Sequence, residues 1–154
     1  MSGATEARLK ELGIEIPSAP APAANYVPFV QSGNLLFISG QIPFVGGNVG
    51  HKGRLGEDLD VAAGKAAARQ CAINILAQCK AALGDLDRIR RVVKLGGFVS
   101  STADFTEQPA VINGASDLMV EVLGERGRHA RFAVGAPVLP LGVSVEIDAI
   151  VEVE

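Results

Sequence analysis

The strongest constraint on the fold is a strict alternation of residue types at the C-terminal end of the chain. From Val143 to Glu154, apolar residues occupy the odd positions and mostly polar residues the even ones. Successive side chains of a β-strand point to opposite faces, so this pattern predicts a strand with one apolar and one mostly polar face. Because Ile150 interrupts the polar face, we expect that face to be completed by other copies of the chain.

Two long helices and four further strands are expected before this strand, with an optional short strand between the first two strands and the first long helix. Apolar residues at three- and four-residue spacing predict a long helix over 60–83, and Pro109 begins a second helix that runs to about Leu123. The strands are expected at 27–31, 35–39, 89–100 and 131–136, with a bulge at Gly96-Gly97 and with 131–136 as the partner of the last strand. This order predicts an α+β fold, a mixed β-sheet with two helices packed on one face.

The first 24 residues are expected to form a short helix and a linker, followed by one domain over residues 25–154. The helix is predicted from Thr5 to Leu12, and the linker from the proline-rich stretch 17–22. Charged residues near the start and the lack of any apolar run of about 18 residues favour a cytoplasmic protein without a membrane span. A net charge of −3 makes nucleic acid an unlikely partner.

Several kinds of catalytic site are disfavoured by the residues themselves. His51 and His129 match no metal-ligand spacing, so we expect no metal; His129 is interpreted as a solvated histidine at a strand entry, with a part in shaping a pocket as the alternative. Cys71 and Cys79 lie about 12 Å apart on one predicted helix, too far for a disulfide, and are expected in the core. Ser39 lacks the surroundings of a hydrolase nucleophile and is expected to form hydrogen bonds beside Gly40.

Arg131 and Glu146 are the candidates for chemistry. A guanidinium can grip a carboxylate through two parallel hydrogen bonds, and a neighbouring glutamate can position a water and exchange a proton. Alternatively, Arg131 forms a surface ion pair with a carboxylate of the last strand, worth about 0–1 kcal/mol. The residue types alone leave both interpretations open.

A set of motifs spread along the chain resembles the Rid/YjgF family, whose members also carry the name endoribonuclease L-PSP. The motifs are Gly33-Asn34-Leu35-Leu36-Phe37-Ile38-Ser39-Gly40-Gln41-Ile42-Pro43, Phe98-Val99, Asn113, Ala130-Arg131, Leu139-Pro140 and Val145-Glu146-Ile147-Asp148-Ala149. Ala133 stands where many members have a cysteine, and the N-terminal helix is typical of a longer branch of the family.

The resemblance implies a chorismate mutase-like fold and a homotrimer with clefts between subunits. It implies a cofactor-independent deaminase that hydrolyses enamine or imine intermediates, such as 2-aminoacrylate, to 2-oxo acids and ammonia. Arg131 would hold the substrate carboxylate and Glu146 would orient the water. The implied substrate-binding residues are Tyr26, Ser39, Gly40, Phe98, Asn113 and Ala133. The alternatives are a non-catalytic protein that binds small carboxylates or acts in regulation, and an endoribonuclease.

Overall fold

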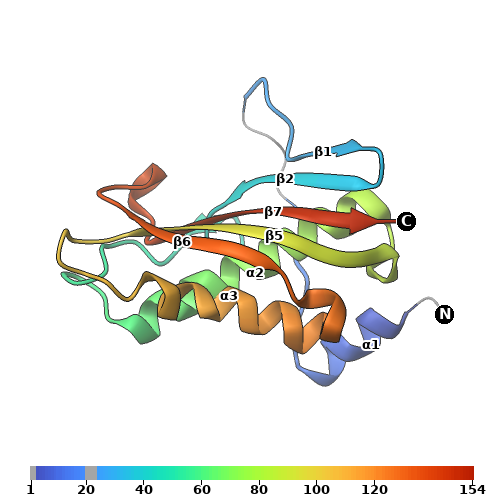
Figure 1. The fold of residues 1–154 in the computed structure, drawn as a ribbon, viewed down its shortest axis with the longest axis horizontal. Helices are drawn as coiled ribbons and strands as arrows, with labels where there is room; N and C mark the ends of the chain where they lie inside the picture. The colour runs from blue at the N-terminus through green and yellow to red at the C-terminus, as the bar shows by residue number, and fades with distance from the viewer. Residues whose placement is uncertain (1–2, 20–23) are drawn as a thin grey trace.

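A computed structural model describes residues 3–19 and 24–154 and contains one mixed sheet with two long helices on one of its faces (Figure 1). Residues 20–22 of the expected linker lie outside the described residues. The helices are α1 (Ala4–Glu11), α2 (Val61–Leu83) and α3 (Gln108–Leu123). The strands are β1 (Phe29–Ser32), β2 (Leu35–Gln41), β3 (Phe44–Val45), β4 (Asn48–Val49), β5 (Ile89–Ser100), β6 (Ala130–Ala136) and β7 (Val145–Val153).

The main sheet has the order β1-β2-β7-β5-β6, and only β5 and β6 run parallel. The predicted alternation is confirmed in β7, where the odd-numbered residues are buried under the helices. The predicted pairing of 131–136 with the last strand is wrong, because β5 lies between β6 and β7. A parallel pair needs a long crossover, and α3 supplies it between β5 and β6.

The helices cover the sheet through their apolar stripes. Asp60 accepts a hydrogen bond from the amide of Ala63 and caps the start of α2, while Gly84 ends it. Cys71 and Cys79 are free thiols buried in the core, as predicted. The opposite face of the sheet, which we call the open face, is not covered by the helices (Figure 1).

Two local predictions require correction. The β-ladder continues without a shift through Gly96 and Gly97, and the register shifts of β5 occur earlier, between Ile89 and Lys94. Both glycines are needed for close approach, because a Cβ on Gly96 would meet Asp148 and Phe132, and one on Gly97 would meet Ile112. The glycines near position 46 form the turn of a small β3–β4 hairpin that the sequence did not predict.

The N-terminal helix α1 packs onto the ends of the other helices. Leu9 is part of the shared core, and Glu6 pairs with Lys80 of α2 at 2.9 Å. Asp87 accepts hydrogen bonds from the hydroxyl and amide of Thr5 and from the amide of Ala4. These bonds lower the pKa of Asp87 to about 2. Within residues 3–19 and 24–154, no helix is long and apolar enough to cross a membrane.

Candidate functional site

Glu146 lies on the open face, in the row of side chains that crosses the sheet from β7 to β6. Its neighbour in the ladder is Phe98 of β5, which in turn lies beside Val134 of β6. On its other side is Gly40 of β2, where a Cβ would collide with the carboxylate of Glu146. The motif glycine therefore leaves room for the glutamate, and we call Glu146, Gly40 and Phe98 the open-face group.

The carboxylate of Glu146 is in an environment that favours its neutral form. Partial burial, and then the negative charge of Asp148 two residues along the same face, raise its pKa above the ordinary value. Within the part of the chain that the structure describes, no hydrogen bond or ion pair holds this carboxylate. A half-buried carboxyl group with a raised pKa and free oxygens is suited to exchanging a proton with a reacting molecule.

Ser39 and Tyr26 are linked through the segment before β1. The Ser39 hydroxyl donates a hydrogen bond to the carbonyl of Val27 at 2.9 Å. Tyr26 precedes Val27 and is 57% exposed. The hydrogen bond therefore joins the Ser39-Gly40 segment of β2 to the segment that carries the exposed Tyr26.

Arg131 lies at the start of β6 and reaches across to α3. Its Nη1 donates to the hydroxyl of Ser116 at 3.0 Å, and its Nη2 donates to the carbonyl of Pro109 at 3.2 Å. Asn113 is half-buried and lies between Pro109 and Ser116 on the same side of α3, at spacings of four and three residues. Ala133, two residues after Arg131, is packed against the core. We call Arg131, Asn113, Ser116 and Ala133 the helix-face group.

The two groups lie on opposite faces of the sheet. In the sheet, Arg131 of β6 is paired with Leu95 of β5, and Leu95 is paired with Ala149 of β7. Leu95 and Ala149 are both buried under the helices, so Arg131 lies on the helix-covered face. Glu146 is three residues from Ala149 in a regular strand, so its side chain points the other way. Arg131 and Glu146 therefore do not meet within one protomer. The alternative ion pair with the last strand is also absent from the described residues, since Arg131 hydrogen-bonds to α3 instead.

Ser116 is the residue that sequence reasoning missed, and His129 was considered only as a solvated histidine or as a residue that helps to shape a pocket. His129 is not simply solvated: its Nε2 lies 2.8 Å from the Ser116 hydroxyl and its Nδ1 lies 2.6 Å from the carbonyl of Gly127. The signal in the sequence was the helical spacing of Pro109, Asn113 and Ser116, which places all three on one stripe of α3.

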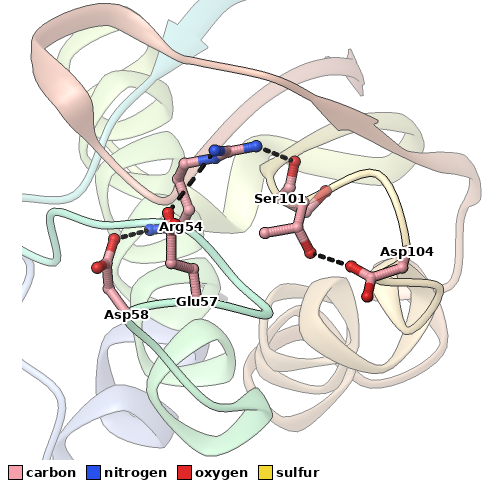
Figure 2. Close-up of polar contacts among 6 residues, drawn as sticks. Arg54, Glu57, Asp58, Ser101 and Asp104 are labelled. Atoms are coloured by element: carbon pink, nitrogen blue, oxygen red, sulfur yellow. Dashed lines mark hydrogen bonds and ion pairs between the residues drawn. The ribbon is translucent and has the colours of Figure 1, made fainter.

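A second arginine, Arg54, provides a contrast with Arg131 (Figure 2). Its Nη2 donates to the carbonyl of Ser101 at 3.1 Å, and its Nη1 lies 3.6 Å from the carboxylate of Glu57. Its backbone amide donates to Asp58. The acids balance the charge of Arg54, which clamps the loop before α2 to the end of β5. Arg131 is bonded only to neutral groups, so its charge is available to an anion.

Among residues 3–19 and 24–154, no three histidine, cysteine or acidic side chains gather as they would around a metal ion.

Comparisons with known proteins agree with this architecture. Residues 6–152 match the family described as "YjgF/chorismate mutase-like, putative endoribonuclease". Protein TCP17 of Trypanosoma cruzi is 56% identical, over 98% of this chain and 95% of TCP17. The structure of Atu1372 from Agrobacterium tumefaciens, described as of unknown function, is 59% identical with a TM-score of 0.92, over 98% of this chain and 93% of that one. RidA from the Antarctic bacterium Psychrobacter sp. PAMC 21119 is 33% identical with a TM-score of 0.62, over 88% and 94% of the two chains. The predicted chorismate mutase-like α+β fold is thus confirmed, and the chain belongs to the YjgF/Rid family.

Proposed function

We propose that this protein is an enamine/imine deaminase that hydrolyses 2-imino acids to 2-oxo acids and ammonia, at sites shared between the subunits of a homotrimer. The observation that carries the proposal is the presence, on opposite faces of one sheet, of the guanidinium of Arg131, which bonds to neutral groups, and the carboxylate of Glu146, which has a raised pKa and no hydrogen-bond partner among the described residues. The first suits a small carboxylate and the second suits the activation of water.

The subunit boundary follows from the opposite faces on which the two groups lie. The open face also carries large apolar side chains that are exposed to solvent in the single subunit. Val30 is 53% exposed, and Phe37, Phe98 and Val134 are each about 40% exposed. If a second copy covers these residues and brings its helix-face group to the open-face group of the first, Arg131 and Glu146 of different subunits meet. Cyclic assembly of three copies would form three such sites.

In this arrangement the carboxylate of the imino acid docks on Arg131, and Asn113 lies beside it. Glu146 of the neighbouring subunit accepts a proton from water as the water oxygen attacks the C=N carbon. Glu146 passes this proton to the nitrogen of the tetrahedral intermediate. The C–N bond then breaks as the hydroxyl proton moves through Glu146 to the leaving nitrogen, so that C=O forms and ammonia leaves with the 2-oxo acid. An imine is already electrophilic, so positioning and one carboxylate suffice for the reaction.

The family description also names endoribonuclease activity, but the carboxylates along β7 do not favour it. Glu146, Asp148 and Glu152 follow one another along the open side of β7, and the chain has a net charge of −3. An RNA backbone is attracted to clustered lysine and arginine, and carboxylates in a row repel it.

The test is to generate 2-imino acids with an amino-acid oxidase in the presence of the purified protein and to follow the disappearance of the imine. We expect Arg131→Ala to lower kcat/KM at least roughly 100-fold, because the bidentate grip on the substrate is lost. Arg128→Ala is the matched control, since Arg128 is exposed and bonds only to Glu125. Equal rates for the Arg131→Ala variant and the wild type, or cleavage of RNA without imine turnover, would contradict the proposal.

A further inference from the structure

A chain of hydrogen bonds leads from Arg131 back into the fold. Nη1 of Arg131 is 3.0 Å from the Ser116 hydroxyl, that hydroxyl is 2.8 Å from Nε2 of His129, and Nδ1 of His129 is 2.6 Å from the carbonyl of Gly127. The four groups come from β6, α3, the segment before β6 and the 3-10 helix Gly124–Gly127. The chain therefore connects the arginine to three other parts of the structure.

The chemistry of its two ends gives the chain a direction. A guanidinium can only donate and a carbonyl can only accept. Nδ1 of His129 therefore carries the proton that Gly127 accepts, and in the neutral ring Nε2 accepts the hydroxyl proton of Ser116. The oxygen of Ser116 is then free to accept from Arg131. Each of the three hydrogen bonds in the chain then has one donor and one acceptor, so each group fixes the orientation of the next.

The far end of the chain is fixed by packing. A Cβ on Gly127 would collide with the backbone of α3 at Met119 and Val120. Only glycine allows this close approach, which places the Gly127 carbonyl directly beside the helix that carries Ser116. His129 is thus held between α3, through Ser116, and the 3-10 helix, through Gly127.

We propose that Ser116 and His129 are positioning residues that hold the Arg131 guanidinium in the orientation that grips a carboxylate. This inference rests on the proposed function of Arg131. With Nη1 held by Ser116 and Nη2 held by Pro109, the guanidinium keeps its Nε–H and one hydrogen on each Nη for the ligand. No carboxylate of the described residues lies within 4.0 Å of it, so the neutral chain orients the group without cancelling its charge.

Arg131 holds the substrate carboxylate in the ground state and in the transition state alike, so loss of its orientation acts mainly on KM. We expect Ser116→Ala and His129→Asn each to raise KM for an imino acid about tenfold, with kcat changed less than about twofold. Ser116→Thr keeps the hydroxyl and should restore KM. The control is His51→Asn, because His51 has no side-chain hydrogen bond among the described residues and asparagine tolerates its positive φ of 56°.

The double variant distinguishes a connected chain from two separate structural effects. Once Ser116 is lost, His129 has no path to Arg131, so we expect Ser116→Ala with His129→Asn to have the KM of Ser116→Ala alone. Additive increases in KM, a fall in kcat with KM unchanged, or acylation of Ser116 by an activated ester would overturn the positioning role.

Two measurements do not depend on turnover. Nitrogen NMR of the ring should show the Nδ1–H tautomer of His129, and an Nε2–H tautomer would overturn the inference. Calorimetry with pyruvate should show about tenfold weaker binding to Ser116→Ala than to the wild type. If the wild type neither turns over imines nor binds pyruvate, the proposed function fails, while the tautomer still decides whether the chain exists as described. If the wild type does both and the variants match it, only the positioning role is wrong.

Discussion

The helix-face group and the open-face group hold their charged residues in opposite ways. Arg131 is bonded at both Nη atoms to neutral groups of α3. Glu146 has no such partner in the described residues, and burial and Asp148 raise its pKa. A fixed cation suits binding, whereas a carboxylate that nothing restrains suits proton exchange. In the proposed function, one face of the sheet supplies the group that anchors the substrate and the other supplies the group that exchanges the proton.

The largest expected effect comes from mixing two inactive variants. Glu146→Gln should lower kcat by roughly 10²- to 10⁴-fold, because the amide cannot accept the proton of water. When subunits of Arg131→Ala and Glu146→Gln are unfolded, mixed in equal amounts and refolded, we expect about one quarter of the wild-type activity, since that share of shared sites would be intact.

The control for the mixing experiment is each variant refolded alone. At a substrate concentration well below KM, each should keep no more than about one hundredth of the wild-type activity. A mixture that is no more active than its parts would mean that each site lies within one subunit. The helix-face group and the open-face group would then be two unrelated parts of the surface.

A smaller effect is expected from Gly40→Ala, which tests whether the open-face group needs space at β2. The new methyl group would occupy the place of the Glu146 carboxylate, and we expect kcat to fall by on the order of tenfold to a hundredfold as the carboxylate moves. The matched control is Gly50→Ala, where the nearest atom is the Pro43 carbonyl at 3.5 Å and the activity should be unchanged. Neither glycine has a positive φ, so the alanine substitutions introduce no backbone strain that could itself change the activity. Similar kinetics for the two variants would remove Gly40 from the group.

The smallest effect concerns stability. The pKa of Glu146 is higher in the folded state than its ordinary value, so the folded state loses stability as pH rises above about 4.5 and Glu146 ionises. Glu146→Gln removes this cost, and we expect Tm at pH 7 to rise by roughly 1–4 °C, with the gain disappearing below pH 4.5.

Thermal unfolding as a function of pH measures this difference. Glu152→Gln on the same face should not raise Tm, because Glu152 accepts a hydrogen bond from Asn34 that the substitution alters. If Glu146→Gln lowered Tm at pH 7, the glutamate would be part of a stabilising contact, and the contrast with Arg131 would be lost.

The sequence by itself determined the elements whose patterns are local. The alternation of β7, the stripe and stop of α2 and the limits of β5 all appear in the structure within a few residues of their predicted bounds. Each depends on the side-chain period of its own segment, which the order of residues records directly. Each motif that indicated the family is likewise a short local stretch of sequence. The motifs therefore identified the candidates Arg131 and Glu146 without any knowledge of where these residues lie in the fold.

Only the tertiary structure decided which strands are neighbours and which face each candidate occupies. β6 carries Phe132 and Val134 on one side and Arg131 and Ala133 on the other, and its pattern would favour the larger apolar pair for the core. The structure instead packs Ala133 against the helices and leaves Val134 42% exposed on the open face. The crossover through α3 sets that choice, as it sets the contact of Arg131 with Ser116. The period of a strand tells which residues share a face, but long-range pairing decides which face is buried.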